Sequence, residues 1–282
     1  MTTTNYVKTT LLLGALTGLI LLCGGLLGGR TGMLIALALA GLMNFGSYWF
    51  SDKLVLARYR AKPVAEAEAP RLHAILDRLC ASAGLPKPKL YILPEKAPNA
   101  FATGRNPAHA AVAVTAGLLE AMDQDEVEGV IAHELAHIKN RDILISSIAA
   151  TIAGAITVVA SMARWGALFG GFGDRNGRSG GSPLAMLAMA IVAPIAALVI
   201  QMAVSRSREY AADATGARIA GNPHGLARAL EKLSQLNRRI PMDASPASSH
   251  LFIVMPLSAG TLSNMFSTHP PVAERIRRLV GR

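Results

Sequence analysis

His133 and His137 are four residues apart and enclose Glu134 in the stretch His133-Glu134-Leu135-Ala136-His137. In a helix this spacing puts both imidazoles on one face, where they can bind one Zn²⁺ ion. Bound zinc lowers the pKa of a water from about 15.7 to about 7, and Glu134 can pass the released proton to a leaving amine. The stretch therefore predicts metal-assisted peptide hydrolysis with Glu134 as the catalytic base. The alternative is a surface helix with two histidines by chance, which its small and apolar residues disfavour.

A catalytic zinc ion needs a third protein ligand. The sequence offers Glu209, which is followed four residues later by Asp213 on the same helical face. Glu209 can coordinate the metal, while Asp213 accepts the free N–H of a ligand histidine and fixes its ring. Taken alone, these residues and the neighbouring arginines are better explained as a solvated ion-pair face. Together with the histidine pair they predict one zinc ion per chain, bound by His133, His137 and Glu209.

Five motifs are similar to those of the HtpX-type membrane-bound zinc metalloproteases, a family related to the CAAX prenyl endopeptidases. The motifs are Asn99–Gly104, His133–His137, Asn140–Asp142, Ser205–Asp213 and Thr268–Pro271. They follow the family's order, and the resemblance covers nearly the whole chain without a departure at a ligand or catalytic position. It implies an α+β zincin-like catalytic domain with transmembrane helices, mostly α-helical, with a small sheet next to the His-Glu-x-x-His helix.

The resemblance also implies a catalytic role for His269, because Thr268–Pro271 matches the family pattern. Such a residue could donate a hydrogen bond to the oxyanion of the tetrahedral intermediate. A helix-capping turn before the predicted helix Val272–Val280 explains the same residues equally well, so both interpretations stay open.

The expected substrate site is a sheet edge, because a zincin binds its substrate as an added extended strand. The resemblance implies that Asn99–Thr103 is this edge strand, with Asn99, Ala100 and Phe101 as substrate-binding residues. An ordinary structural hairpin is the alternative.

Hydrophobic periodicity and turn residues predict the elements that position these side chains. Helices are predicted at Pro70–Ala83, Ala116–Met122, Glu126–Asn140, Pro223–Arg239 and Val272–Val280, and strands at Lys89–Leu93, Ala100–Thr103 and Ala110–Thr115. A helix, a short sheet and then a ligand-bearing helix is the order of a small zincin core. The stretch Ile240–Thr268 is rich in Ser, Pro and Met, which predicts an irregular cover for the cleft.

Four stretches without a charged residue predict membrane spans in a chain that is 51% hydrophobic and only 16% charged. They are Leu11–Gly29, Gly32–Phe50, Ile143–Ala163 and Leu184–Val204. About 20 residues suffice to cross a bilayer as a helix, and four such runs make buried core helices of a soluble enzyme a weaker interpretation. The predicted order is a transmembrane hairpin (1–50), a first catalytic part (51–142), two spans joined by a Gly-rich loop (143–204) and a second catalytic part (205–282).

Basic residues beside these spans predict their orientation. Ten lie on the side of both termini and the His-Glu-x-x-His helix, against four on the opposite side. The positive-inside rule therefore puts the catalytic parts and both termini of this multi-pass protein in the cytoplasm. The family resemblance implies that the membrane is the bacterial inner (plasma) membrane. His137 precedes the third run by six residues and Glu209 follows the fourth by five. Two antiparallel spans would thus hold both ligands roughly 8–9 Å beyond the spans.

Composition also limits the partners. The net charge is +10, but no nucleic-acid motif accompanies the basic residues, so anionic lipid head groups are expected rather than nucleic acid. Cys23 and Cys80 show neither a disulfide framework nor a metal-ligand spacing, which fits a reducing compartment for the soluble part. The expected partners are the lipid bilayer and protein substrates, and the sequence specifies no oligomeric state.

The leading functional interpretation is a zinc endopeptidase that cleaves misfolded or damaged membrane proteins, in membrane quality control and the stress response. The substrate class follows from the family resemblance and from the predicted site beside the membrane. A CAAX-type processing protease is the first alternative, but this chain is short for the enclosed chamber of such enzymes. Charged residues on both sides of the ligand helix argue against an intramembrane protease. The intact Glu134 argues against a catalytically silent scaffold or chaperone.

Overall fold

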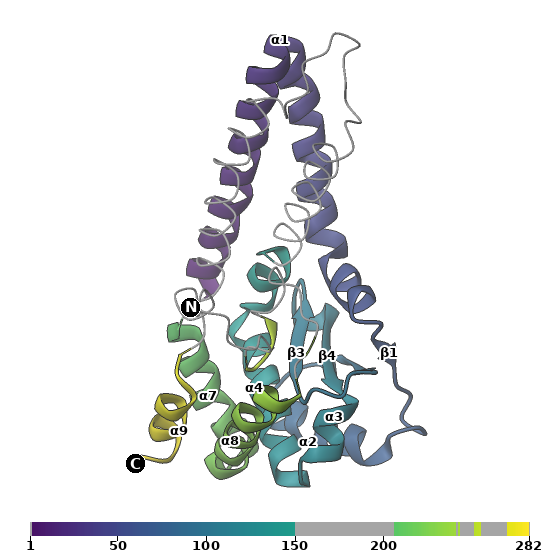
Figure 1. Ribbon diagram of the computed structural model, residues 1–282, viewed down its shortest axis with the longest axis vertical. Helices are drawn as coiled ribbons and strands as arrows, with labels where there is room; N and C mark the ends of the chain where they lie inside the picture. The colour runs from purple at the N-terminus through teal and green to yellow at the C-terminus, as the bar shows by residue number, and fades with distance from the viewer. Residues whose placement is uncertain (1, 150–205, 241, 243–250, 255–269, 282) are drawn as a thin grey trace.

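The computed structural model of the chain describes residues 2–149, 206–240, 242, 251–254 and 270–281. A long helical hairpin stands above a body of helices and a small sheet, and the C-terminus lies in this body (Figure 1). The elements are α1 (Thr2–Arg58), β1 (Lys62–Pro63), α2 (Pro70–Ala83), β2 (Lys89–Leu93), β3 (Ala100–Gly104), the 3-10 helix η1 (Pro107–His109), β4 (Ala110–Thr115), α3 (Ala116–Ala121), α4 (Gln124–Asn140), α7 (Arg206–Ala220), α8 (Pro223–Arg239) and α9 (Val272–Val280).

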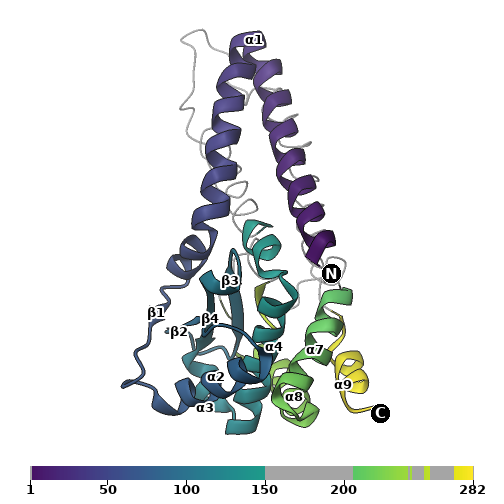
Figure 2. The ribbon, with the colours of Figure 1, turned by 180° about the vertical axis from the view of Figure 1, so that it is seen from behind.

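The N-terminal element α1 is a hairpin of two helical arms. The chain reverses at Gly29, whose φ of 55° lies in the left-handed region that favours glycine. Figures 1 and 2 show the two arms facing each other. Asn44 Nδ2 donates to Thr17 Oγ1 at 2.9 Å across 27 residues of sequence, a separation of about 40 Å in a straight helix. Within the described residues one helical segment, Gly29–Arg58, is long and apolar enough to cross a membrane, by length and composition alone.

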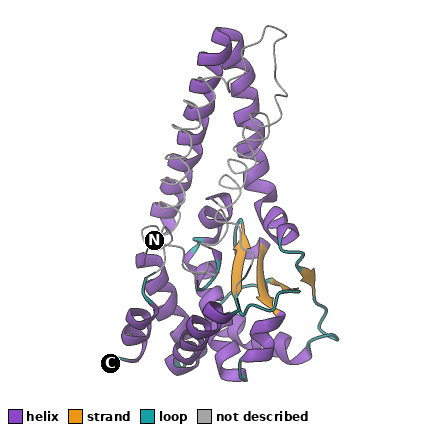
Figure 3. Cartoon of the chain, viewed as in Figure 1, coloured by secondary structure: helices purple, strands orange, loops and turns teal. Residues whose placement is uncertain are grey.

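A four-stranded mixed sheet with the strand order β1-β2-β4-β3 packs beside the helices (Figure 3). Strand β2 pairs parallel with β4, whereas β3 pairs antiparallel with β4 and β1 with β2. Strand β3 is therefore an edge strand. Because successive side chains of a strand point to opposite faces, Ala100 and Ala102 pack in the core that contains α4, and Phe101 packs on the other face with the end of α1.

Helix α4 carries the His-Glu-x-x-His stretch through the middle of the body. It begins with a capping box, in which Asp123 and Glu126 each bind the other's backbone N–H. It ends at Arg141, which has a φ of 59°. Most of its side chains are buried against α2, β3, α7 and α8, because its small and apolar residues form contacts on nearly all sides. The two histidines therefore lie in the protein interior.

Glycines let α7 and α8 approach α4 closely. A Cβ atom at Gly216 would lie 2.9 Å from the Cα atom of His133, and one at Gly129 would lie 2.3 Å from the backbone N of Leu226. Carbon atoms in favourable contact are about 3.5–4.0 Å apart, so no larger residue fits at either position without a shift of the helices. The close approach brings α7 onto the face of α4 that carries the histidines.

The predicted elements agree with the structure, and the bounds of α2, α8, α9, β2 and β4 coincide. Helix α4 begins two residues earlier than predicted because Asp123 caps it, and β3 extends to Gly104. A mostly helical body with a small sheet is thus confirmed, whereas the described residues contain one candidate span where four were predicted. Residues 143–149 of the third run are helical. The rest of that run, the fourth run and the Gly-rich loop lie outside the described residues.

Candidate metal centre

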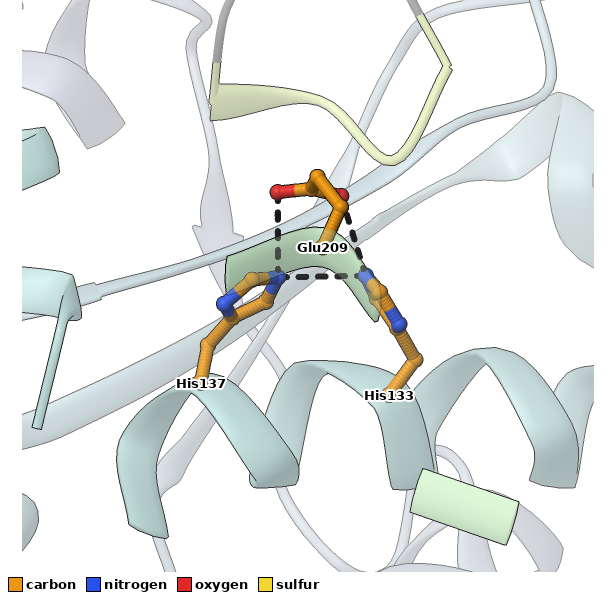
Figure 4. A group of neighbouring side chains, drawn as sticks. All are labelled: His133, His137 and Glu209. Atoms are coloured by element: carbon orange, nitrogen blue, oxygen red, sulfur yellow. Dashed lines mark hydrogen bonds and ion pairs between the residues drawn. The ribbon is translucent and has the colours of Figure 1, made fainter. Parts of the chain in front are cut away.

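Three side chains meet between two helices. His133 and His137 extend from α4, and Glu209 reaches them from α7 (Figure 4). The Nε2 atoms of the two histidines are 3.1 Å apart. A Glu209 oxygen lies 3.7 Å from Nε2 of His133, and the other lies 3.8 Å from Nε2 of His137. The structure therefore brings together the three residues that the sequence predicts as metal ligands, with one candidate ligand atom of each within 4.8 Å of the others.

These separations fit a tetrahedral metal ion. Metal–ligand distances of about 2.0–2.2 Å, as for zinc, give ligand–ligand separations of about 3.3–3.6 Å in a tetrahedron. The observed separations of 3.1, 3.7 and 3.8 Å lie on either side of that range. Two imidazoles and one carboxylate also leave a fourth coordination position open, as catalytic sites require.

Asp213 fixes the orientation of His133. Its Oδ1 lies 3.0 Å from Nδ1 of the histidine, so a proton on Nδ1 leaves the lone pair of Nε2 for a metal. Burial lowers the pKa of His133, although the hydrogen bond to Asp213 acts in the opposite direction. The ring is therefore neutral at physiological pH, as a metal ligand must be.

Arg275 of α9 holds Asp213 in turn. Its Nε and Nη2 donate to the two Asp213 oxygens at 2.8 and 2.7 Å, a bidentate pair. Its Nη1 donates to the backbone carbonyl of Ile253 at 2.8 Å, and Nη2 lies 3.4 Å from Nε2 of His133. Burial raises the pKa of Asp213, but the charge and hydrogen bonds of Arg275 outweigh it and lower that pKa. Arg275 thus keeps the carboxylate ionised and oriented toward His133.

Asp142 orients His137 in the way that Asp213 orients His133. Its Oδ2 lies 3.1 Å from Nδ1 of the ring, because the positive φ of Arg141 turns the chain back after α4. Burial lowers the pKa of His137, but the carboxylates of Asp142, Glu209 and Glu134 together raise it to about 10. In the metal-free chain His137 is therefore an imidazolium, and its Nε2–H can donate to the Nε2 of His133. A bound cation would replace this proton.

Glu134 lies between the two ligands and is 2% exposed. Burial raises the pKa of its carboxyl to about 7; the Glu209 charge adds to this, while His137 and a hydrogen bond with the Ala102 backbone oppose it. A carboxyl with a pKa near the working pH can both accept and donate a proton. The residue thus has the position and the protonation behaviour of a general base and acid.

The predicted substrate-binding residues lie at the start of the edge strand β3, and all three are buried. Asn99 Nδ2 donates to the carbonyl of Val254, and the Ala100 carbonyl accepts from the N–H of Ile253. The role of this edge in substrate binding stays a prediction. His269 lies outside the described residues, so its role as an oxyanion donor also stays a prediction.

Asp142 and Arg275 take part in the site although no role was predicted for either from the sequence. Asp142 follows His137 by five residues, directly after the end of the helix, and this position is the signal that could have revealed it. Arg275 is 62 residues from Asp213 and lies among exposed basic residues on a short amphipathic helix, so no spacing connects the two.

Comparison with known proteins identifies relatives over nearly the whole chain. The family model for peptidase family M48 matches residues 66–282. A protein named Protease HtpX homolog from Desulfatibacillum aliphaticivorans is 61% identical, over 98% of this chain and 89% of that protein. Proteins of the same name from Syntrophobacter fumaroxidans and Pyrococcus furiosus are 60% and 53% identical, over 96% and 97% of this chain and 97% and 94% of theirs.

A solved structure with a related fold is the crystal structure of S. mikatae Ste24p. It superposes with a TM-score of 0.52 at 20% sequence identity, and the match covers 98% of this chain and 66% of that one. At this identity the similarity concerns the fold alone.

Proposed function

The chain belongs to peptidase family M48 and is a metalloprotease, and from this premise we propose that it is a zinc endopeptidase of the bacterial inner membrane that cleaves misfolded or damaged membrane proteins. The observation that carries the proposal is the meeting of His133, His137 and Glu209 around one point, with the buried Glu134 beside them. Two imidazoles, one carboxylate and a free base are the parts that metal-assisted peptide hydrolysis requires.

In this mechanism the bound zinc ion would supply the positive charge that polarises the peptide carbonyl and makes water a better nucleophile. Asp213 and Asp142 hold the two imidazoles with their Nε2 atoms toward the metal position. Glu134 accepts a proton from the attacking water and returns it to the leaving amine. Its hydrogen bond with the Ala102 backbone fixes this carboxylate against β3, where the substrate strand would lie.

Membrane attachment is supported by the surface of the second arm of α1. Large apolar side chains are exposed along this arm, namely Met33, Leu34, Ile35, Leu37, Leu39, Leu42 and Phe45. The partly exposed Tyr48, Trp49 and Phe50 follow toward the body, and the Arg105 guanidinium stacks 4.5 Å from the Trp49 ring. Aromatic and basic side chains at this level are typical of a lipid–water interface. We propose that the catalytic body faces the cytoplasm just beyond this interface.

The proposal can be tested with the full chain purified in detergent. Zinc-loaded protein should degrade unfolded casein, chelation should abolish the activity, and added zinc should restore it. Glu134→Gln should retain zinc and lose turnover, because the ligands remain while the base does not. Full activity of this variant with normal zinc content would remove Glu134 from its role. A prenylated peptide serves as the second substrate, and its preferential cleavage would favour a CAAX-type processing protease.

A further inference from the structure

The segment Leu251–Val254 lies along the outer edge of β3. The N–H of Ile253 donates to the Ala100 carbonyl at 3.1 Å, and Asn99 Nδ2 donates to the Val254 carbonyl at 2.9 Å. In Figures 1 and 2 the short yellow-green ribbon of this segment lies between α4 and β3. The segment is bent and forms no regular strand, but one backbone hydrogen bond and one bond from the Asn99 side chain attach it to the edge of the sheet.

Two further backbone groups on this edge are also bonded. In an extended strand every second residue directs its backbone N–H and C=O groups toward the same side. On the outer edge of β3 these residues are Ala100, Ala102 and Gly104. The Ala102 backbone bonds Glu134, and the N–H of Gly104 donates to Ser147 Oγ at 3.4 Å. A substrate strand that pairs with the Ala100 carbonyl would therefore take the place of Leu251–Val254.

The side chains of the segment point alternately to the two faces of the sheet. Ile253 is buried in the core around α4, and Phe252 is buried on the opposite face. Phe252 is 1% exposed and makes edge-to-face contacts with Tyr59 and Phe101, with ring centroids 5.1 and 5.4 Å away. Such aromatic contacts add to the apolar burial of the ring. Tyr59 and Phe101 thus form a pocket that accepts one large apolar side chain.

The segment also lines the catalytic cavity. Residues 251–253 line one cavity together with Glu134, His137 and Glu209, and its volume is about 30 Å³. One water needs about 10–15 Å³ by this measure, so the cavity has room for a water or two and none for a peptide residue. A peptide at the catalytic groups needs more room than this cavity offers, and displacement of the segment would provide it.

We propose that Leu251–Val254 is a stand-in for the substrate strand, and that the pocket of Tyr59 and Phe101 selects substrates with a large apolar side chain. The inference rests on the proposed peptidase function and adds the substrate class, which is an extended apolar segment with Phe, Leu or a similar residue where Phe252 now lies. Such segments become accessible when membrane or core regions of a protein unfold. The substrate then competes with the chain's own segment for one pocket.

A tether tests whether the segment must leave. In a chain with Cys23→Ala and Cys80→Ala, the pair Ala100→Cys and Ile253→Cys joins two residues that share a backbone hydrogen bond and are buried in the same core, which suits a disulfide. The oxidised protein should retain zinc and lose at least about 90% of the casein turnover that the same variant shows in its reduced form. Full turnover of the cross-linked protein, or failure of the pair to cross-link at all, would overturn the proposal.

A binding experiment tests the pocket without relying on turnover. The probe is a labelled peptide with the sequence Ser-His-Leu-Phe-Ile-Val-Met-Pro, measured on zinc-loaded Glu134→Gln protein. Phe252→Ala should bind this peptide about tenfold more tightly than the parent, whereas the matched control Phe252→Leu should not, because leucine still fills the pocket. Replacing Phe by Ala in the peptide should remove the gain.

Equal binding of both peptides, or no gain with Phe252→Ala in a protein that unfolds cooperatively, would contradict the assigned pocket. If the parent chain degrades no casein but binds the peptide as expected, the proposed proteolysis fails and the pocket assignment stands. The two failures are therefore distinguishable.

Discussion

Each ligand histidine has a carboxylate partner of its own. Asp213 holds His133 from the neighbouring helix, and Asp142 holds His137 from the residue after the turn at the end of α4. A hydrogen bond of this kind sets both the tautomer and the direction of the coordinating nitrogen. Because both ring nitrogens are engaged, the two histidines are oriented before a metal binds.

Loss of a residue that orients a metal ligand typically weakens metal binding about 10–100-fold. Glu209→Ala removes one of the three predicted ligands itself and should weaken zinc binding by more than this. Asp213→Ala should fall within that range. The measurement is competition with a chromophoric chelator. Glu231→Ala, an exposed position on α8, is the control and should bind zinc as the parent does. Unchanged affinity of Glu209→Ala would mean that the third ligand lies elsewhere.

Zinc binding should release a proton from His137. Its pKa of about 10 in the metal-free chain means that it is charged below that pH, and coordination needs the neutral ring. Between pH 7 and 10 the apparent zinc affinity should therefore rise with pH, by up to about tenfold per unit. Titration calorimetry in buffers of different ionisation enthalpy measures the number of protons.

Asp142→Asn is the matched variant for this measurement. It removes a carboxylate that raises the pKa of His137, so less than one proton should be released at pH 8. A proton count near zero in the parent at pH 8 would contradict the charged state of the metal-free histidine.

Arg275 is expected to act as a positioning residue through Asp213. Arg275→Lys keeps the charge but loses the bidentate fork, so zinc affinity should fall about tenfold even where the variant remains folded. Arg275→Ala leaves Asp213 buried without this partner and should cost about 3–5 kcal/mol of folding free energy. The exposed Arg277→Lys on the same helix is the control. Parent-like zinc affinity of Arg275→Lys would limit Arg275 to a structural role.

At the scale of elements, the site depends on how closely two helices pack. Helix α4 supplies two ligands and α7 supplies the third, and the approach of α7 is possible because Gly216 has no side chain toward His133. Helix α9 then covers this pair with Arg275. The position of the metal is therefore set by helix packing as much as by the ligand residues.

Gly216→Ala should push α7 away from α4. The new Cβ atom would meet the backbone of His133 at 2.9 Å, so we expect a loss of about 1–3 kcal/mol in folding free energy and weaker zinc binding. Gly41→Ala makes the same change in α1, where nothing lies within 4 Å of the new atom. It should leave zinc binding unchanged. Thermal unfolding and zinc titration of both variants test the packing argument, which fails if Gly216→Ala behaves like its control.

For the whole molecule, the hairpin α1 rises from one end of the catalytic body (Figure 1). Its second arm exposes apolar side chains. The start of the third apolar run, residues 143–149, contacts the end of β3 through Ser147, whose Oγ lies 2.7 Å from that of Thr103. The predicted membrane segments thus connect to the body next to the metal site.

Cysteine labelling tests the predicted orientation of these segments. A cysteine at Ser179 should react with an impermeant thiol reagent added outside intact spheroplasts, and one at Ser248 should react only after lysis. The background lacks Cys23 and Cys80. Labelling of both positions from outside, or of neither, would contradict the four-span arrangement. The metal assignment would be unaffected, because it rests on residues within the body.

The sequence alone predicted the residues that meet at the site, the base candidate Glu134, and most helices and strands of the body, although it missed the short strand β1. These follow from local rules, since residues four apart share a helix face and alternating residues share a strand face. It also paired Asp213 with a ligand histidine, but the packing of α7 on α4 decided that this histidine is His133. The bidentate contact of Arg275 and the position of Leu251–Val254 on β3 were decided by tertiary structure as well. Both join segments far apart in the chain, and such contacts depend on how the elements pack in space, which no spacing within the sequence encodes.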